Sequence, residues 1–539
     1  MKFVYKSLSQ IFFNIFILLF FSYFSVANEN EIENKILRFR LENGLTVFIL
    51  EDSSDALVRA ELIVRCGYTD QTDETVGYVP LLSKLIFDTN GKFQNIEIQG
   101  TKTNIEGIIA YKGIRYATAS RFEYPTQVTS WEGIYDATKY GNCSYQPRAF
   151  YNEEEVPEKA FYYHEFRKGE TYTYSEDCLF LNIFIPENIT EFCNLPVLIY
   201  IHGGGFTGGC GHELHFDTPI WSKKGVIGVT INYRLGPLGF ACFEKQKEEL
   251  GHTGNYGLFD QLTAIKWVKD NISSFGGNPN NITIMGQSAG AMSVQQLCLS
   301  PLSDNLFHKA IMCSGGGVSK MMSTASAEKR YDFWQLVMNE VGCSTLDEFK
   351  TVDVEKLFSA WSKLKKEVKD AGMAAAPVLD DLFVIGNGAS LVKENKYQQI
   401  PYIVGSTSED IVPPFIHKMA KSWCETQNQD SYCYMFNHQL PGDDKGAWHS
   451  SDLWYWFGTL DHCWRPLTNV DYELSDKMTS YLTNFVKTGN PNGDELPIWN
   501  KASKKEKKVL HLGNGIVEMQ KTKTSKLWVN LFTKKAVGE

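Results

Sequence analysis

Three patterns are missing from the sequence, and each absence argues against a class of protein. The twelve cysteines include no C-x-x-C pair, which argues against a zinc ribbon. The chain has no excess of basic residues: its net charge is -10, so it would repel the phosphates of a nucleic acid. Beyond one apolar run near the N-terminus, no stretch is long enough to cross a bilayer. These absences point to a globular protein, and 539 residues can bury a large core.

The N-terminus has the pattern of a targeting signal. Lys2 and Lys6 precede an apolar run over residues 11–24, and small residues follow up to Ala27. Asn14 interrupts the run, which is short for a membrane span. We expect residues 1–27 to be a signal peptide cleaved after Ala27, with an uncleaved anchor as the alternative. Use of the signal would export the protein to the periplasm or the outside.

Residues 28–92 form a segment of their own in the sequence. Two β-rich runs flank an Asn-Gly pair at 43–44, which predicts a hairpin. This segment resembles the start of insulinase-like (inverzincin) metallopeptidases, whose zinc helix carries H-x-x-E-H. The matching positions hold Pro80, Ser83 and Lys84, none of which is a zinc ligand of that family. We interpret residues 28–92 as a truncated insulinase-like fragment that lacks zinc ligands.

From residue 93 onward, strand-like and helix-like segments alternate, which predicts an α/β sheet with covering helices. Within this part, an apolar run over residues 282–285 leads into G-x-S-x-G at 286–290, and a helix-compatible segment follows from Ala291. This is the pattern of a nucleophile elbow, a sharp strand-to-helix turn that presents a serine hydroxyl. Ser288 is therefore the predicted nucleophile.

A second glycine-rich loop predicts how the site would stabilise negative charge. A continuous apolar run over 195–201 ends in His-Gly-Gly-Gly-Phe at 202–206. Without Cβ atoms, these amides can converge on a carbonyl oxygen that gains charge in the transition state. We expect Gly204, Gly205 and Ala289 to form the oxyanion hole. A phosphate cradle is the alternative, but no G-x-x-x-x-G-K-[ST] follows.

The region from Gly113 to Asn182 resembles type B carboxylesterases, the family that includes the cholinesterases. The resemblance implies an α/β-hydrolase fold for residues 93–539, with a mostly parallel, twisted sheet and helices on both faces. It also implies a disulfide between Cys143 and Cys178, which would close a loop over the entrance to the active site. Two unpaired core cysteines are the alternative.

A serine nucleophile needs a base and an acid, which follow it along the chain in the order acid, then histidine. Residues 446–452 match the family loop G-x-x-H-x-x-[DE], which assigns the base to His449. The acid should come after the strand at 401–405, where the family has G-x-x-x-[DE]-E-G. Alignment on the glycine of that strand places Asp410 at the catalytic acid. Glu409 is the rival, because the glycine that follows in the family is missing here.

Together these residues predict a serine hydrolase that cleaves carboxylic esters through an acyl-enzyme and needs no metal or organic cofactor. The expected partner is a small-molecule ester, with no nucleic acid and no integral membrane domain. Lys168 and Gln287 replace the tryptophan and glutamate of cholinesterases, which argues against a choline ester. A non-catalytic esterase-like binding protein is one alternative, and a zinc peptidase is another that Pro80, Ser83 and Lys84 contradict.

Overall fold

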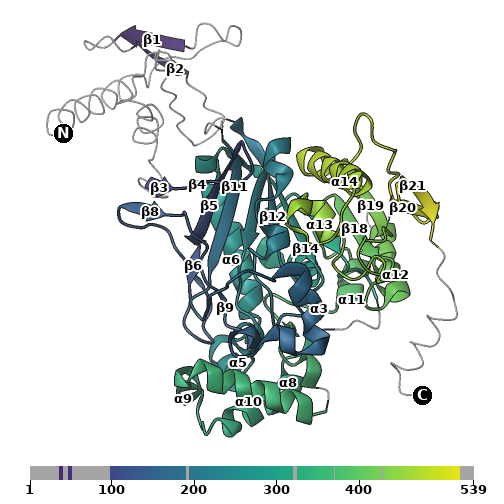
Figure 1. Cartoon of the computed structure of the whole chain (residues 1–539). Coiled ribbons are helices and arrows are strands. Elements are labelled where there is room, and N and C mark those ends of the chain that lie inside the picture. Colours follow the sequence, from purple (N-terminus) through teal and green to yellow (C-terminus); the bar gives the residue numbers. More distant parts are fainter. Residues whose placement is uncertain are drawn as a thin grey trace. The chain divides into compact units, whose positions relative to one another are not determined.

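The computed structural model describes residues 36–40, 46–50, 97–187, 189, 193–319, 324–369, 371–426 and 429–522. The chain divides into two compact units, 1–95 and 96–539. In the first unit, β1 (Ile36–Arg40) and β2 (Thr46–Leu50) pair antiparallel with Arg40 opposite Thr46, so the hairpin expected around 43–44 is confirmed (Figure 1). The expected signal peptide and the positions that replace the zinc ligands lie outside the described residues.

The second unit is built on one large sheet (Figure 1). Its central strands are all parallel, and antiparallel strands close both edges. In spatial order the strands are β21 (Ile516–Lys521), β20 (Lys508–Gly513), β19 (Ser431–Phe436), β18 (Tyr402–Thr407), β15 (Lys309–Cys313), β14 (Gly277–Gln287), β12 (Leu195–Ile201), β13 (Ile227–Ile231), β11 (Phe180–Pro186), β5 (Ile108–Arg115) and β4 (Thr101–Lys102).

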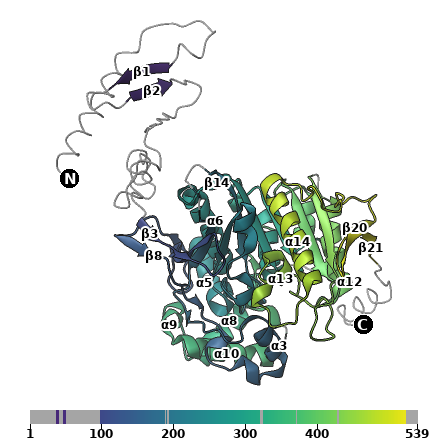
Figure 2. The ribbon, with the colours of Figure 1, turned by 45° about the horizontal axis from the view of Figure 1, so that its top comes forward.

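Helices cover both faces of this sheet, as expected (Figures 1 and 2). The helix α14 packs on β12, β14 and β20, whereas α6 and α7 pack on β14 and α12 packs on β18 and β19. The helices are α3 (Pro157–Phe166), α4 (Gly236–Phe240), α5 (Glu244–Leu250), α6 (Tyr256–Asn271), α7 (Ala289–Leu299), α8 (Glu328–Glu340), α9 (Leu346–Thr351), α10 (Val354–Glu367), α11 (Gly388–Lys393), α12 (Pro413–Thr426), α13 (Leu453–Phe457) and α14 (Asn469–Thr488).

Short strand pairs lie outside the large sheet. They are β3 (Glu97–Gln99) with β8 (Ile134–Asp136), β6 (Ala117–Thr118) with β7 (Thr126–Gln127), β9 (Cys143–Ser144) with β10 (Tyr174–Ser175), and β16 (Ala325–Ser326) with β17 (Val378–Leu379). The pair β9–β10 joins the two ends of the segment that contains α3. This pairing fixes where that segment leaves and re-enters the body of the unit.

The centre of the sheet explains why its strands read as unbroken apolar runs. The strand β12 has a parallel neighbour on each side, β13 and β14, so both of its faces are covered. Its residues from Val197 to Ile201 are fully buried, as the apolar run at 195–201 predicted. The carboxyl ends of β12 and β14 lead into the glycine loop and the elbow, and so these two loops emerge at the same edge.

A buried ion pair fixes the loop after β13 to α6. The guanidinium of Arg234 donates from Nε and Nη2 to the two carboxylate oxygens of Asp260, at 2.8 and 2.7 Å. The backbone amide of Arg234 donates to the same carboxylate at 3.0 Å, and both side chains are buried. The Asn232 amide likewise bridges two loops, donating to the carbonyl of Asn142 at 2.9 Å and accepting from Gly211 N–H at 2.7 Å. These polar residues therefore hold loops in place.

We expect Asp260→Asn to lower the free energy of unfolding by about 3–5 kcal/mol, because it leaves the buried Arg234 charge uncompensated. Chemical denaturation of the variant measures the loss. Asp270→Asn is the matched control, since Asp270 is an exposed aspartate near the end of the same helix. An equal loss in both variants would contradict a specific role for the buried pair.

The disulfide prediction was wrong in its second partner. Cys143 is bonded to Cys210, with the two Cα atoms 5.5 Å apart, and Cys178 is a buried free thiol. Two hydrogen bonds explain the pairing: Gln146 Nε2 donates to the carbonyl of Gly209, and the Gly209 N–H donates to Gln146 Oε1, both at 3.0 Å. They bring the residue before Cys210 to the segment that carries Cys143. Burial raises the pKa of the Cys178 thiol to about 12.

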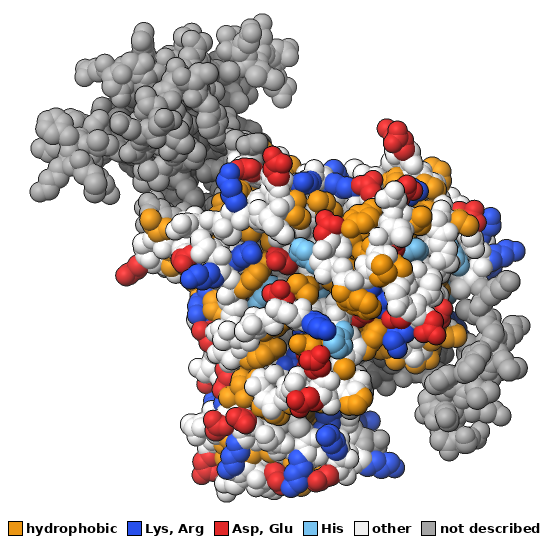
Figure 3. Space-filling model, viewed as in Figure 1, with side chains coloured by type: hydrophobic (Ala, Val, Ile, Leu, Met, Phe, Trp, Pro, Cys, Tyr) orange, Lys and Arg blue, Asp and Glu red, His pale blue; other side chains and the backbone are white. Residues whose placement is uncertain are grey.

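The surface of the second unit carries mixed charge. On the face shown in Figure 3, lysine and arginine side chains are interspersed with aspartate and glutamate, and apolar side chains lie between them. Among the described residues, none of the helices combines the length and the apolar character needed to cross a membrane.

Candidate active site

The nucleophile elbow has the geometry that its glycines predicted. The strand β14 ends at Gln287 and α7 begins at Ala289, so Ser288 alone makes the turn. Its φ of 56° and ψ of -124° are strained for a residue with a side chain. A Cβ on Gly290 would lie 2.1 Å from the carbonyl oxygen of Ile201, so no other residue fits there without a shift. The elbow therefore packs directly against the end of β12.

The structure brings His449 and Asp410 together, although they lie 39 positions apart in the sequence. His449 Nδ1 lies 2.6 Å from Asp410 Oδ1, and both residues are buried. The Asp410 carboxylate also accepts from the backbone amides of Ile411, at 2.9 Å, and Thr407, at 3.3 Å. Burial alone would raise the pKa of Asp410, but its hydrogen bond and charge interaction with His449 hold that pKa below the usual value. The carboxylate therefore stays ionised, and His449 Nδ1 carries the proton.

Glu409 contributes its backbone to this arrangement. Its N–H donates to the carbonyl of Ala447 at 3.0 Å, which ties the acid loop to the histidine loop. Its side chain is exposed and accepts from the Ser408 hydroxyl at 3.2 Å. Of the two acids that the sequence left open, the one in contact with His449 is Asp410.

The hydrogen bond at the other nitrogen of His449 comes from Gln287. Gln287 Nε2 lies 3.2 Å from His449 Nε2, and both side chains are buried. Because Nδ1 carries the proton, Nε2 is an acceptor and the Gln287 amide is the donor. In the described part of the chain, no hydrogen bond links the Ser288 hydroxyl to His449. Such contacts are often long in an enzyme without substrate and shorten when it binds.

The glycine loop passes beside the elbow. A Cβ on Gly203 would lie 3.0 Å from the Cβ of Ser288, so the two loops are in contact. Gly204 has a φ of 106°, and a Cβ there would lie 1.9 Å from the carbonyl oxygen of Gly208, which only glycine tolerates. Gly205, with a φ of 62°, follows. Ala289 begins α7, where the backbone amides of a helix have no partner within the helix. The three predicted amides thus lie on two adjoining loops.

Aromatic residues of α3 cover the histidine loop. These contacts were not predicted from the sequence. The Tyr162 hydroxyl donates to the carbonyl of His449 at 3.3 Å. The rings of Phe161, Tyr162 and Phe166 lie 5.0, 5.8 and 5.6 Å from the ring of Trp448. The dense run of aromatics at 161–166 was the available signal. These contacts hold the backbone on which the imidazole is carried.

Asp452, the acid at the end of the histidine motif, lies in the core. Its Oδ2 accepts from the Tyr434 hydroxyl at 2.8 Å and from Trp456 Nε1 at 3.2 Å. Burial raises the pKa of this carboxyl to about 6, although the bond from Tyr434 partly offsets the effect. The histidine motif thus supplies His449, which contacts Asp410, and Asp452, which anchors the loop.

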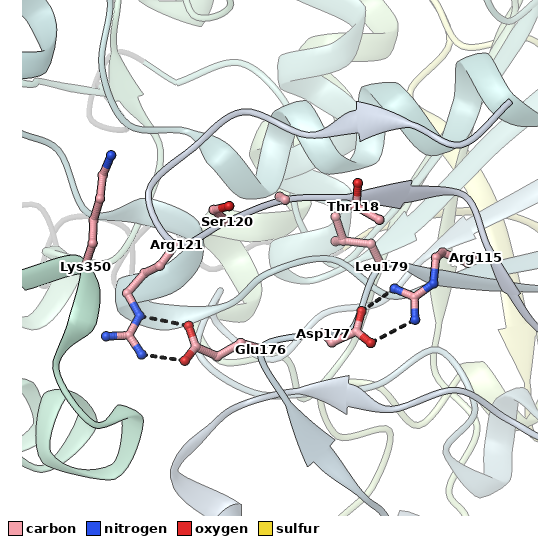
Figure 4. A pocket seen from close by; sticks show the side chains of 9 residues that line it. Arg115, Thr118, Ser120, Arg121, Glu176, Asp177, Leu179 and Lys350 are labelled. Carbon is pink, nitrogen blue, oxygen red and sulfur yellow. Dashed lines mark hydrogen bonds and ion pairs between the residues drawn. The ribbon is translucent and has the colours of Figure 1, made fainter. Parts of the chain in front are cut away.

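A separate surface cavity of about 520 Å³ contains none of the predicted site residues (Figure 4). Two ion pairs dominate its lining, Arg115 with Asp177 and Arg121 with Glu176, and in each pair both carboxylate oxygens are bonded. Each arginine is thereby neutralised by its partner. The lining of this cavity is thus a pair of closed ion pairs, and the residues of the elbow and of the histidine loop lie elsewhere.

The fold and the elbow define an α/β-hydrolase. The sequence matches the Carboxylesterase family over residues 89–418 and 411–528, and the chain belongs to that family. It is 30% identical to the para-nitrobenzyl esterase of Bacillus subtilis (strain 168) over 463 residues, 74% of this chain and 90% of that protein. It is also 30% identical to the bile salt-activated lipase of Mus musculus over 490 residues, 73% and 77% of the two chains.

Solved structures agree with this assignment. A thermophilic PNB esterase superposes with a TM-score of 0.69 at 28% identity, covering 81% of this chain and 98% of that one. An esterase from Clostridium hathewayi, described as hydrolysing aliphatic aromatic polyesters, superposes with a TM-score of 0.67 at 25% identity, covering 78% and 93%. The chain is thus a carboxylic ester hydrolase, and the expected family and fold are confirmed.

Proposed function

We propose that Ser288, His449 and Asp410 form the catalytic triad of this esterase. In the reaction the Gln287 amide gives up its bond to His449 Nε2, and that nitrogen takes the proton of the Ser288 hydroxyl as the hydroxyl oxygen attacks the ester carbonyl. The amides of Gly204, Gly205 and Ala289 then hold the oxyanion. His449 returns the proton to the departing alcohol, and water repeats the steps on the acyl-enzyme. The buried contact of 2.6 Å between His449 and Asp410 carries this proposal, because it leaves Nε2 able to accept a proton.

The proposed substrate class rests on the two positions at which cholinesterases carry a tryptophan and a glutamate. The buried side chain next to the nucleophile is the neutral Gln287, and Lys168, at the position of the cholinesterase tryptophan, is exposed and cationic. Neither attracts a quaternary ammonium group. Two relatives are named para-nitrobenzyl esterase and bile salt-activated lipase, and neither name refers to a choline ester. We therefore propose neutral esters with an apolar acyl group as substrates.

Steady-state kinetics with p-nitrophenyl butyrate and butyrylthiocholine test this proposal. We expect kcat/KM for the neutral ester to exceed that for the cationic ester by at least about 10-fold, the size of effect that one charged contact has. A serine-directed phosphonate should stop the reaction and appear on the peptide that contains Ser288. A chelator should leave the rate unchanged. Faster turnover of the cationic ester, or labelling of a different serine, would contradict the proposal.

We also propose that the protein is exported and that its signal peptide, residues 1–27, is removed. The mature chain then consists of an insulinase-like fragment at 28–92 and the esterase domain at 93–539. The basic and apolar pattern before Ala27 supports export. Edman sequencing of the protein from its native source should give Asn28 as the first residue. A protein that retains Met1 and stays with the membrane fraction would instead indicate an uncleaved anchor.

A further inference from the structure

Cys143, Cys210 and His212 form a cluster that the esterase reaction does not use. Their donor atoms lie within 4.8 Å of one another. His212 Nδ1 lies 3.1 Å from Cys210 Sγ, and His212 Nε2 lies 3.6 Å from Cys143 Sγ. Both cysteines are buried and the histidine is half-buried. Two thiolates and an imidazole are the ligands that zinc and similar ions prefer.

Neighbouring side chains hold the imidazole with its edge toward the two sulfurs. The ring of Tyr140 stacks on His212 with centroids 4.4 Å apart and an angle of 4° between the planes. The Tyr140 hydroxyl donates to the carboxylate of Asp217, which fixes the stacking ring in turn. Outer residues that fix the orientation of a ligand strengthen metal binding. The histidine is therefore preorganised in position and plane.

The His212 side of this cluster borders a cavity, which neither cysteine lines. A cavity of about 140 Å³ opens onto His212 and is lined by Asn142 and Thr173, which flank the Cys143 segment. The Thr173 carbonyl accepts the N–H of Cys143 at 2.8 Å, so a residue that lines the cavity is bonded to the backbone of Cys143. Glu170 and Asp217 also line it, and their negative charges favour a cation.

We propose that the Cys143–Cys210 pair and His212 are a redox-gated metal site, closed as a disulfide when oxidised and able to bind a thiophilic divalent ion when reduced. Reduction breaks the S–S bond with two electrons and two protons and forms two thiols. A tertiary phosphine supplies the electrons and becomes a phosphine oxide with oxygen from water. The ion then displaces both thiol protons, and His212 provides the third ligand. Water can fill a fourth position.

The site would link two segments that matter for the esterase. Cys210 follows the glycine loop, and Cys143 belongs to the segment held by β9 and β10. Both the disulfide and a bound ion connect these segments, whereas the free dithiol does not. Binding of the ion should therefore raise the melting temperature of the reduced protein, because the ion binds the folded state preferentially.

Co²⁺ is a suitable probe because thiolate-to-cobalt charge transfer reports sulfur ligation directly. The full chain is reduced with a phosphine, desalted without oxygen and titrated with Co²⁺, with native mass spectrometry for stoichiometry. We expect one ion per chain in the reduced protein and none in the oxidised protein. Cys210→Ser should abolish binding, and Cys463→Ser, which removes a half-buried cysteine elsewhere, should leave it intact.

His212→Ala keeps both cysteines, so its disulfide and fold are preserved for a fair comparison. We expect the variant to bind Co²⁺ at least about 10-fold more weakly. No charge-transfer band in the reduced wild type, or undiminished binding in Cys210→Ser or His212→Ala, would overturn the proposal.

Discussion

Ser288→Ala is expected to lower kcat for p-nitrophenyl butyrate by about 10⁶-fold, because it removes the oxygen that forms the acyl-enzyme. The substitution removes one hydroxyl from a strained turn and adds no atoms, so the fold should be kept. KM should change little, since the glycine loop and the surrounding pocket remain. Stopped-flow and steady-state assays on the purified variant measure the rate, and the phosphonate label should disappear from it.

Ser274→Ala is the matched control, because Ser274 is an exposed serine before β14, the strand that leads to the elbow. Its kcat should equal that of the wild type. Turnover that survives Ser288→Ala at a tenth of the wild-type rate would show that another group is the nucleophile. Equal melting temperatures of the two variants would exclude unfolding as the cause of a loss.

Much of the fold could be predicted because burial leaves a clear mark on the sequence. The apolar run at 195–201 is continuous since β12 has covered faces on both sides, and the alternation of strands and helices indicated the parallel sheet. The helix expected from Ala291 begins at Ala289 instead, because the elbow leaves no room for a longer turn. Local patterns thus gave the elements and their order, with small errors at their ends.

The candidate site was predictable where a short motif fixes the backbone, and less so where contacts come from distant segments. Asp410 and His449 were found from loops with their own patterns, and the structure places them in contact. The contact of Gln287 with His449 joins residues 162 positions apart, and no local pattern marks it. The prediction of the disulfide partner was wrong for the same reason. Family spacing suggested Cys178, but hydrogen bonds between Gln146 and Gly209 bring Cys210 to Cys143.

Asp410→Asn is expected to lower kcat by about 10⁴-fold with little change in KM. An asparagine amide facing Nδ1 would donate a hydrogen bond, which favours the tautomer of His449 with the proton on Nε2. That tautomer cannot accept the proton of Ser288. The variant also loses the negative charge that stabilises the imidazolium formed during the reaction. Steady-state kinetics with p-nitrophenyl butyrate give the ratio.

The neighbouring acid provides the decisive comparison. Glu409→Gln alters an exposed side chain and keeps the backbone bond to Ala447, so its kcat should stay within about 3-fold of the wild type, as for most surface changes. If Glu409→Gln instead caused the large loss and Asp410→Asn did not, Glu409 would be the triad acid. In that case the loop would have to rearrange when substrate binds, because His449 Nδ1 already lies against Asp410. The pair of variants therefore tests both the residue assignment and whether the loop keeps its conformation during turnover.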